Sequence, residues 1–156
     1  MKTLIIGLGN PILTDDGVGF HVVEVLKETL PNSDSIEVAQ ASVGGVTLME
    51  MMVGFDRVII IDAFLTEQPK PGTIHRMTID DLEVLTPTQH TASPHDATLR
   101  TALEAGRRLG LILPKDIIIY AIEVMNVSDF SDQLTPSVAE TIPKVLNLIL
   151  NEINQN

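Results

Sequence analysis

The sequence predicts a three-layer α/β/α sandwich built around a mostly parallel five-stranded sheet. Three aliphatic runs without polar alternation have the pattern of strands buried on both faces, and they cover Leu4–Leu8, Val58–Ala63 and Ile117–Val124. Segments with helical periodicity alternate with these runs, which favours a parallel sheet covered by helices. Two shorter runs complete the predicted sheet, Ile36–Ala39 and, behind a turn at residues 69–72, Thr73–Thr78 as an edge strand.

The first predicted helix follows the first strand. Its apolar stripe begins at Val18 and ends before Pro31, and we expect Asp15 to cap its N-terminus. A shorter helix is predicted over Val46–Met52, closed near Gly54.

Two further helices are predicted in the second half of the chain. Ser93 and Pro94 form a capping pattern for a helix that ends near Leu109, with Gly110 as its C-cap. The last helix opens at Thr135-Pro136, and Pro143 is expected to kink it.

Composition narrows the class of protein. At 156 residues the chain is expected to form a single catalytic domain over residues 1–156. A formal net charge of −11 argues against nucleic acid and against an anionic membrane surface as partners. The N-terminus lacks the pattern of a signal peptide and no run reaches the ~20 apolar residues of a membrane span, so we expect a cytoplasmic protein.

The chain contains no cysteine, which excludes disulfides, thiolate metal sites and a Cys nucleophile. No G-x-S-x-G elbow is present, so a Ser/His/Asp triad is disfavoured. A metal site in this chain must therefore use carboxylates and its four histidines, which are His21, His75, His90 and His95.

The segment from Gly7 to Gly19, GLGNPILTDDGVG, predicts a strand, a tight loop and a helix start. It is not a dinucleotide fingerprint, because Ile12 stands where the third glycine would fall and Pro11 interrupts the loop. The adjacent acids Asp15 and Asp16 would also repel a pyrophosphate. A metal or a polar backbone suits this loop better than an anion.

Three candidate functional residues follow strands or open a helix. Asp62 ends the strongest predicted strand, at the edge where α/β proteins bind ligands, although a loop acid held by backbone N–H groups explains it equally well. Asp16 opens toward the same edge, with a helix N-terminal acid as its structural alternative. His95 lies in the first turn of a helix, where the dipole favours a neutral ring able to ligate a metal, although such a residue is more often a cap.

The other histidines have simpler interpretations. His21 lies near an apolar stripe and is expected to pack there, whereas His75, in the edge strand, and His90, in a loop, are expected to be solvated. His90 is kept as a reserve ligand because it is five residues from His95.

Together Asp16, Asp62 and His95 would present two carboxylates and one imidazole from three loops at one sheet edge. Three protein ligands leave open positions for substrate or water, and without thiolates the set suits nickel, zinc or manganese. Spacing alone does not choose among these metals.

An ordered set of motifs resembles the endopeptidases that mature nickel–iron hydrogenases. The set is GLGNPILTDDGVG, VIIIDAF around Asp62, P-G-T at residues 71–73, SPHDATL around His95 and LTP at residues 134–136. The resemblance implies a protease that removes a C-terminal extension from the hydrogenase large-subunit precursor after nickel insertion. It also implies that Asp16, Asp62 and His95 are the catalytic residues and bind the nickel, which the precursor supplies, and that no organic cofactor is needed. We expect the enzyme to act as a monomer.

Two departures from the family pattern are visible. The first acid is often Glu in the family, so Asp16 is one methylene shorter. Many members carry an Asp-Gly-Gly-Thr loop where this chain has Gln40 followed by Ala41, Ser42 and Val43, which indicates another hydrogenase subclass.

Three alternatives remain open from the sequence. A non-enzymatic chaperone or nickel sensor would bind nickel or the precursor without cutting it. A peptidyl-tRNA hydrolase also opens with GLGNP, but Ile12 replaces its next glycine and the acidic charge suits tRNA poorly. A nucleotide-binding module is disfavoured by Ile12 and Pro11.

Overall fold

A central sheet carries the fold, as the buried aliphatic runs predict. The computed structural model describes residues 1–81 and 95–155, and of residues 95–98 only the backbone. The strands run in the order β2-β1-β3-β5-β4, with β4 antiparallel at one edge and the others parallel. Their bounds are β1 Thr3–Leu8, β2 Ile36–Ala41, β3 Arg57–Phe64, β4 Ile74–Thr78 and β5 Asp116–Glu123.

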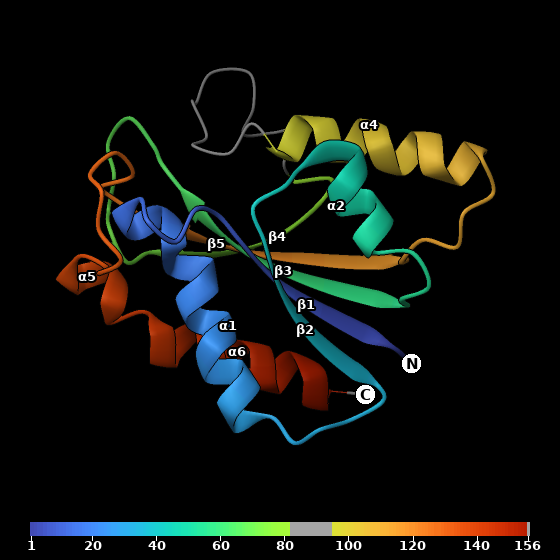
Figure 1. The fold of residues 1–156 in the computed structure, drawn as a ribbon, viewed down its shortest axis with the longest axis horizontal. Coiled ribbons are helices and arrows are strands. Elements are labelled where there is room, and N and C mark those ends of the chain that lie inside the picture. The colour runs from blue at the N-terminus through green and yellow to red at the C-terminus, as the bar shows by residue number, and fades with distance from the viewer. Residues whose placement is uncertain (82–94, 156) are drawn as a thin grey trace.

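Helices cover both faces of the sheet and make three layers (Figure 1). One face packs against α1 and α6, the other against α2 and α4. The helices are α1 Val18–Thr29, α2 Gly45–Met51, α4 His95–Arg108, α5 Pro136–Ala139 and α6 Ile142–Asn154, with a 3-10 helix, η1, at Thr14–Gly17. The predicted fold class is confirmed, and every predicted strand is present within two residues of its expected bounds.

The core consists of two aliphatic layers, one on each side of the sheet. All of β1 is buried, and in β3 and β5 every residue after the first is buried. Since burying one Ile or Leu side chain contributes about 1.5–3 kcal/mol, these three strands supply the main stabilisation of the sheet. They also hold their carboxyl ends rigidly, which matters for the groups placed there.

Two details of the helices differ from expectation. Asp15 does not cap α1: the N-cap residue is Gly17, and the Asp15 carboxylate binds a different loop. Pro143 does not kink a continuous last helix, because the helix is broken into α5 and α6, and Pro143 lies in the first turn of α6. A proline is tolerated in a first turn, where its missing N–H has no intrahelical partner to lose.

The C-cap prediction at Gly110 is confirmed. Gly110 has φ +81°, its N–H donates to Arg107, and the N–H of Leu111 donates to Gly106. This is a Schellman motif, which ends α4. The expected cap at Ser93 lies outside the described residues.

A polar network on the α6 face joins the C-terminal helix to the sheet edge. Arg76 of β4 donates twice to the Glu152 carboxylate, at 2.9 Å each, and the Tyr120 hydroxyl donates to the same group at 2.9 Å. Burial of Tyr120, with a smaller contribution from Glu152, raises the pKa of its hydroxyl to about 12.

The raised pKa of Tyr120 predicts a loss of stability in alkaline solution. The phenol is protonated more readily in the folded chain, so its contribution is complete below about pH 10 and is lost as pH rises toward 12. The loss amounts to at most about 3 kcal/mol. Urea unfolding between pH 8 and 12 should show this decline in the wild type and a smaller one in Tyr120→Phe. Parallel pH curves for the two proteins would contradict the assignment; this is the only tyrosine in the chain.

Candidate active site

Asp16 is presented by a tight turn after β1. Its Oδ2 accepts the N–H of Asn10 at 2.9 Å, which ties the carboxylate back to the start of its own loop. Gly9 has φ +134°, and a Cβ at this position would collide with the carbonyl oxygen of Asp16. Glycine is therefore required for the loop to fold back closely on the residue that it presents.

The segment before Asp16 is anchored to the loop between β5 and α5. Thr14 has φ +52°, an uncommon conformation for a β-branched residue. Its hydroxyl donates to the carbonyl of Asp129 at 2.7 Å, and its N–H donates to Ser131 at 2.9 Å. These bonds hold a strained residue directly before the two acids, and such strain is common at functional sites.

Asp15 is the centre of this anchor. It is completely buried, and its carboxylate accepts the N–H groups of Met125, Asn126 and Thr135, as well as the Thr135 hydroxyl at 2.9 Å. Asp15 therefore fixes the loop that carries Asp16, and the two adjacent acids have separate roles. The sequence predicts an acid pair here but does not show that Asp15 joins segments 110 and 120 residues apart.

Asp62 lies near the carboxyl end of β3. It is 6% exposed, and its Oδ1 accepts the N–H of Ala63 at 2.8 Å. Its neighbours two residues away, Ile60 and Phe64, belong to the core layer under α2 and α4, so Asp62 belongs to the same face by the two-residue period of a strand. Burying a carboxylate in an otherwise aliphatic layer carries a desolvation cost, and the carboxyl end of a parallel strand is where α/β proteins bind ligands, so Asp62 is a candidate functional residue.

The structure brings Asp16 and Asp62 to the same edge of the sheet. η1 lies against β3, and the first turn of α1 approaches β3 so closely that a Cβ at Gly19 would contact the carbonyl oxygen of Ile61. Both carboxylates also make interactions within the folded chain. The predicted placement of these two acids at one edge is therefore confirmed.

His95 is the first residue of α4. Figure 1 shows the first turn of α4 over the half of the sheet toward which the parallel strands run. The backbone thus places His95 on the side that carries the two acids, while its side chain, like all of His90, lies outside the described part of the structure. Among the described residues there is no group of three His, Cys, Asp or Glu that could hold a metal, and that set does not include the His95 side chain.

Another histidine has partners that the sequence did not predict. The His75 side chain is 39% exposed, in keeping with the expectation that it is solvated, but its Nε2 also lies 2.8 Å from Glu123 Oε1 and its ring packs edge-on against Phe64, with centroids 5.6 Å apart. The pairing arises because β4 pairs with β5, which brings the two side chains together. Strand order is the missing information, since the sequence alone does not show which strand flanks the edge.

Two other polar residues near the edge, Gln40 and His21, have structural partners. Gln40 of β2 donates from Nε2 to the carbonyl of Phe20 at 3.2 Å, so it braces α1. His21 is half-buried, as expected, and bonds the carbonyl of Asp132 at 3.1 Å.

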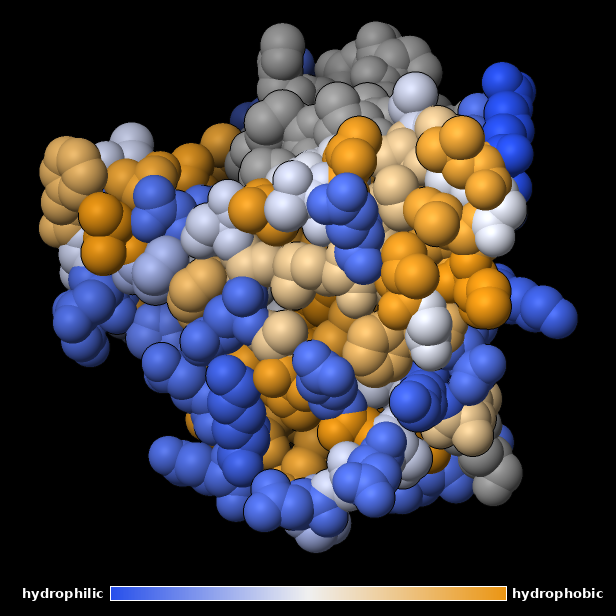
Figure 2. All heavy atoms as spheres, turned by 45° about the vertical axis from the view of Figure 1, so that its right-hand side comes forward, coloured by the Kyte–Doolittle hydropathy of each residue, from blue (hydrophilic) through white to orange (hydrophobic). Residues whose placement is uncertain are grey.

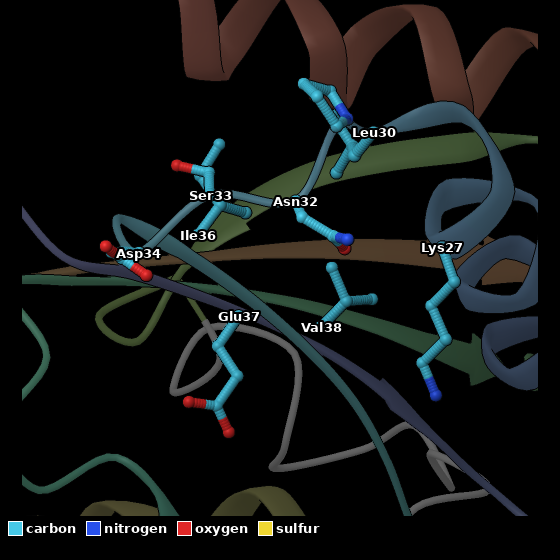
Figure 3. Close-up of a pocket in the computed structure, with 9 residues that line it drawn as sticks. Lys27, Leu30, Asn32, Ser33, Asp34, Ile36, Glu37 and Val38 are labelled. Carbon is cyan, nitrogen blue, oxygen red and sulfur yellow. The ribbon is translucent and has the colours of Figure 1, made fainter.

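A surface hollow of about 380 Å³ lies between α1 and the start of β2, away from the carboxyl edge. Figure 3 shows its charged side chains, Lys27, Asp34 and Glu37, pointing in different directions instead of converging. This arrangement does not favour catalysis.

Apolar side chains gather near the ends of α2 and α4 (Figure 2), where Val53, Leu109, Leu111 and Ile112 are exposed. Within this surface the N–H of Gly54 donates to the carbonyl of Ile112 at 2.9 Å. This bond ties the segment after α2 to the segment after α4. It lies at the opposite end of the strands from Asp16 and Asp62.

No helix in the described residues is long and apolar enough to cross a membrane.

The sequence and the fold of this chain match those of known proteins. The model of the hydrogenase maturation protease family matches residues 20–152. Hydrogenase 2 maturation protease of Escherichia coli is 30% identical over 156 residues, covering all of this chain and 93% of that protein. A putative hydrogenase maturation protease of Methanocaldococcus jannaschii is 28% identical, with 97% and 96% of the two chains covered.

Solved structures agree with the sequence relatives. The hydrogenase maturating endopeptidase HybD of E. coli superposes with a TM-score of 0.84 at 28% identity, covering 99% of this chain and 93% of that one. The [NiFe] hydrogenase maturation protease HybD of Thermococcus kodakarensis has the same fold, with a TM-score of 0.72 at 24% identity over 97% and 98% of the two chains. These matches leave peptidyl-tRNA hydrolase and a plain nucleotide-binding module without support. The chain belongs to the hydrogenase maturation protease family.

Proposed function

We propose that this protein is an endopeptidase that removes the C-terminal extension of a nickel–iron hydrogenase large-subunit precursor after nickel has been inserted. The observation that carries the proposal is the placement of Asp62, nearly buried at the end of β3, beside the turn that presents Asp16. Membership of the family and likeness to a hydrogenase maturating endopeptidase support hydrolysis as the reaction.

The proposed metal ligands are Asp16, Asp62 and His95, and the metal is the nickel that the precursor carries. Two carboxylates and one imidazole are suitable donors for a divalent first-row ion, and a chain without cysteine has no softer ligand to compete with them. Three protein donors leave positions for the ligands that the substrate brings. The nickel is then a recognition element, because a precursor without it lacks the group that these residues bind.

The chemistry follows from this arrangement. Metal held at the site would polarise the scissile carbonyl or a nearby water, which removes the need for a Ser or Cys nucleophile. The chain's own contribution is positioning: the anchored loop fixes Asp16, and the sheet fixes Asp62. Both carboxylates are set before substrate arrives, so little reorganisation is needed on binding.

The test uses the large-subunit precursor from the same organism, prepared nickel-free and nickel-loaded. After incubation with the protein, mass spectrometry should show loss of a C-terminal peptide from the nickel-loaded form alone. Cleavage of both forms would contradict recognition through nickel. Binding without a mass change would contradict the endopeptidase proposal and favour an assembly chaperone that binds the precursor without cutting it.

A further inference from the structure

A second ionisable pair lies on the same face of the sheet as Asp62 and is not part of the proposed metal site. His75 Nε2 is 2.8 Å from Glu123 Oε1, and Glu123 Oε2 accepts the N–H of Lys70 at 2.7 Å. The Glu123 side chain is 10% exposed and that of His75 is 39% exposed. The acid is thus held inside the fold, while the imidazole reaches the surface.

The pairing determines which nitrogen of His75 carries the hydrogen. A carboxylate can only accept, so Nε2 is the donor and Nδ1 of the neutral ring is left as an acceptor. The edge-on contact with Phe64 fixes the ring from a second side. A histidine whose N–H is held by a carboxylate is the arrangement that enzymes use to orient a general base.

The sheet register places this histidine in line with Asp62. Asp62 pairs with Ala121 across β3 and β5, and Ala121 pairs with His75 across β5 and β4. Paired residues share a face, so the three side chains form one row under the layer that contains α4. With strands ~4.8 Å apart, the Cα atoms of Asp62 and His75 are separated by about 10 Å, and the residue between them in this row is Ala121, whose side chain is a methyl group.

Hydrolysis of a peptide bond needs a group that takes a proton from water and returns it to the leaving amine. Asp16 and Asp62 are poor bases once they hold a cation, because its charge stabilises their ionised form. We propose that His75, oriented by Glu123, is the general base of the cleavage reaction. This inference rests on the proposed function.

His75 takes up one proton and returns it within each cleavage cycle. His75 Nδ1 takes a proton from water while the water oxygen bonds to the scissile carbonyl carbon. When the carbon–nitrogen bond breaks, the imidazolium returns the proton to the leaving nitrogen, and His75 is neutral again. Next to His75 is a hollow of about 380 Å³ whose other lining residues are Phe64, Thr66, Glu67, Gln68, Lys70 and Glu123, and it can receive the peptide chain that leaves.

The experiment compares His75→Gln with the wild type on nickel-loaded precursor. The Gln amide can still donate to Glu123 but cannot take up a proton, so the hydrogen bond is kept while the base is removed. We expect kcat to fall at least about 100-fold, the usual contribution of a general base, with KM unchanged within about twofold.

Two further variants test whether His75 acts as the general base. Glu123→Gln removes the carboxylate that orients the ring and should lower kcat without changing KM. His21→Gln is the matched control, because His21 lies on α1 and its Nε2 bonds the carbonyl of Asp132, and the kcat of this variant should equal that of the wild type. Charged groups around His75, namely Glu67, Lys70, Glu123 and Asp62, are the same in the control.

Other results overturn the inference. Wild-type kcat in His75→Gln would show that His75 is not the base, and a rise in KM alone would show that it only binds substrate. Both conclusions require that His75→Gln and the wild type have the same melting temperature. If His75→Gln melts at a lower temperature, the same comparison of kcat and KM is made with His75→Asn. Failure of the wild type itself to cleave nickel-loaded precursor would refute the proposed function instead.

Discussion

Asp16→Asn should lose at least about 100-fold of its cleavage rate on nickel-loaded precursor while remaining folded. The amide is neutral and a weaker metal ligand than the carboxylate, and even outer-shell partners of a metal site cost 10–100-fold when removed. The Asn oxygen can still accept the N–H of Asn10, so the free energy of unfolding should fall by no more than about 1 kcal/mol. Single-turnover cleavage and urea unfolding measure the two effects separately.

Asp16→Glu is the matched variant for this prediction. It keeps the charge and has the longer acid that is frequent in the family, so it should retain much of the activity that Asp16→Asn loses. Equal cleavage by the wild type and Asp16→Asn would remove Asp16 from the proposed ligand set.

Asp15→Asn should lose stability, whereas Asp16→Asn should mainly lose cleavage rate. The buried carboxylate accepts three backbone N–H groups and the Thr135 hydroxyl, and an amide has only one acceptor oxygen for them. Leaving buried donors without partners costs about 1–3 kcal/mol each, partly offset by relaxation, so we expect a loss of about 3 kcal/mol. Urea unfolding of the purified variant provides the measurement.

Asp34→Asn serves as the control for the Asp15 variant. Asp34 is an exposed acid in the turn before β2, and its substitution should change stability by less than about 0.5 kcal/mol. If Asp15→Asn were as stable as this control, the anchor between the η1 loop and the segment 125–135 would not stabilise the fold.

The sheet was predictable because its strands are buried on both faces. Such strands consist of uninterrupted Ile, Val and Leu, and this pattern is visible without knowledge of the partner strands. Strand order was not predictable, since a parallel strand with two aliphatic faces can pair with any similar strand. The break between α5 and α6 was missed because the apolar periodicity continues through Pro143.

The positions of Asp16 and Asp62 were predictable because they depend on where each residue lies relative to the end of a strand. Asp62 ends a strand and Asp16 follows one, so both had to lie at the carboxyl edge of a parallel sheet. The roles of Asp15 and His75 depend on contacts with Thr135 and Glu123, which are far away in sequence. An acid that binds distant backbone N–H groups looks the same in the sequence as a helix cap, which explains the error at Asp15.

The central claim is that Asp16 and Asp62, with His95, bind the nickel that the precursor carries. The most direct measurement is nickel-edge X-ray absorption of nickel-loaded precursor, mixed with the protein and frozen before cleavage. With the wild type we predict additional oxygen and nitrogen scatterers in the first coordination shell of nickel. They should be fewer with the double variant Asp16→Asn/Asp62→Asn. Identical nickel spectra for precursor alone, with the wild type and with the double variant would contradict the claim.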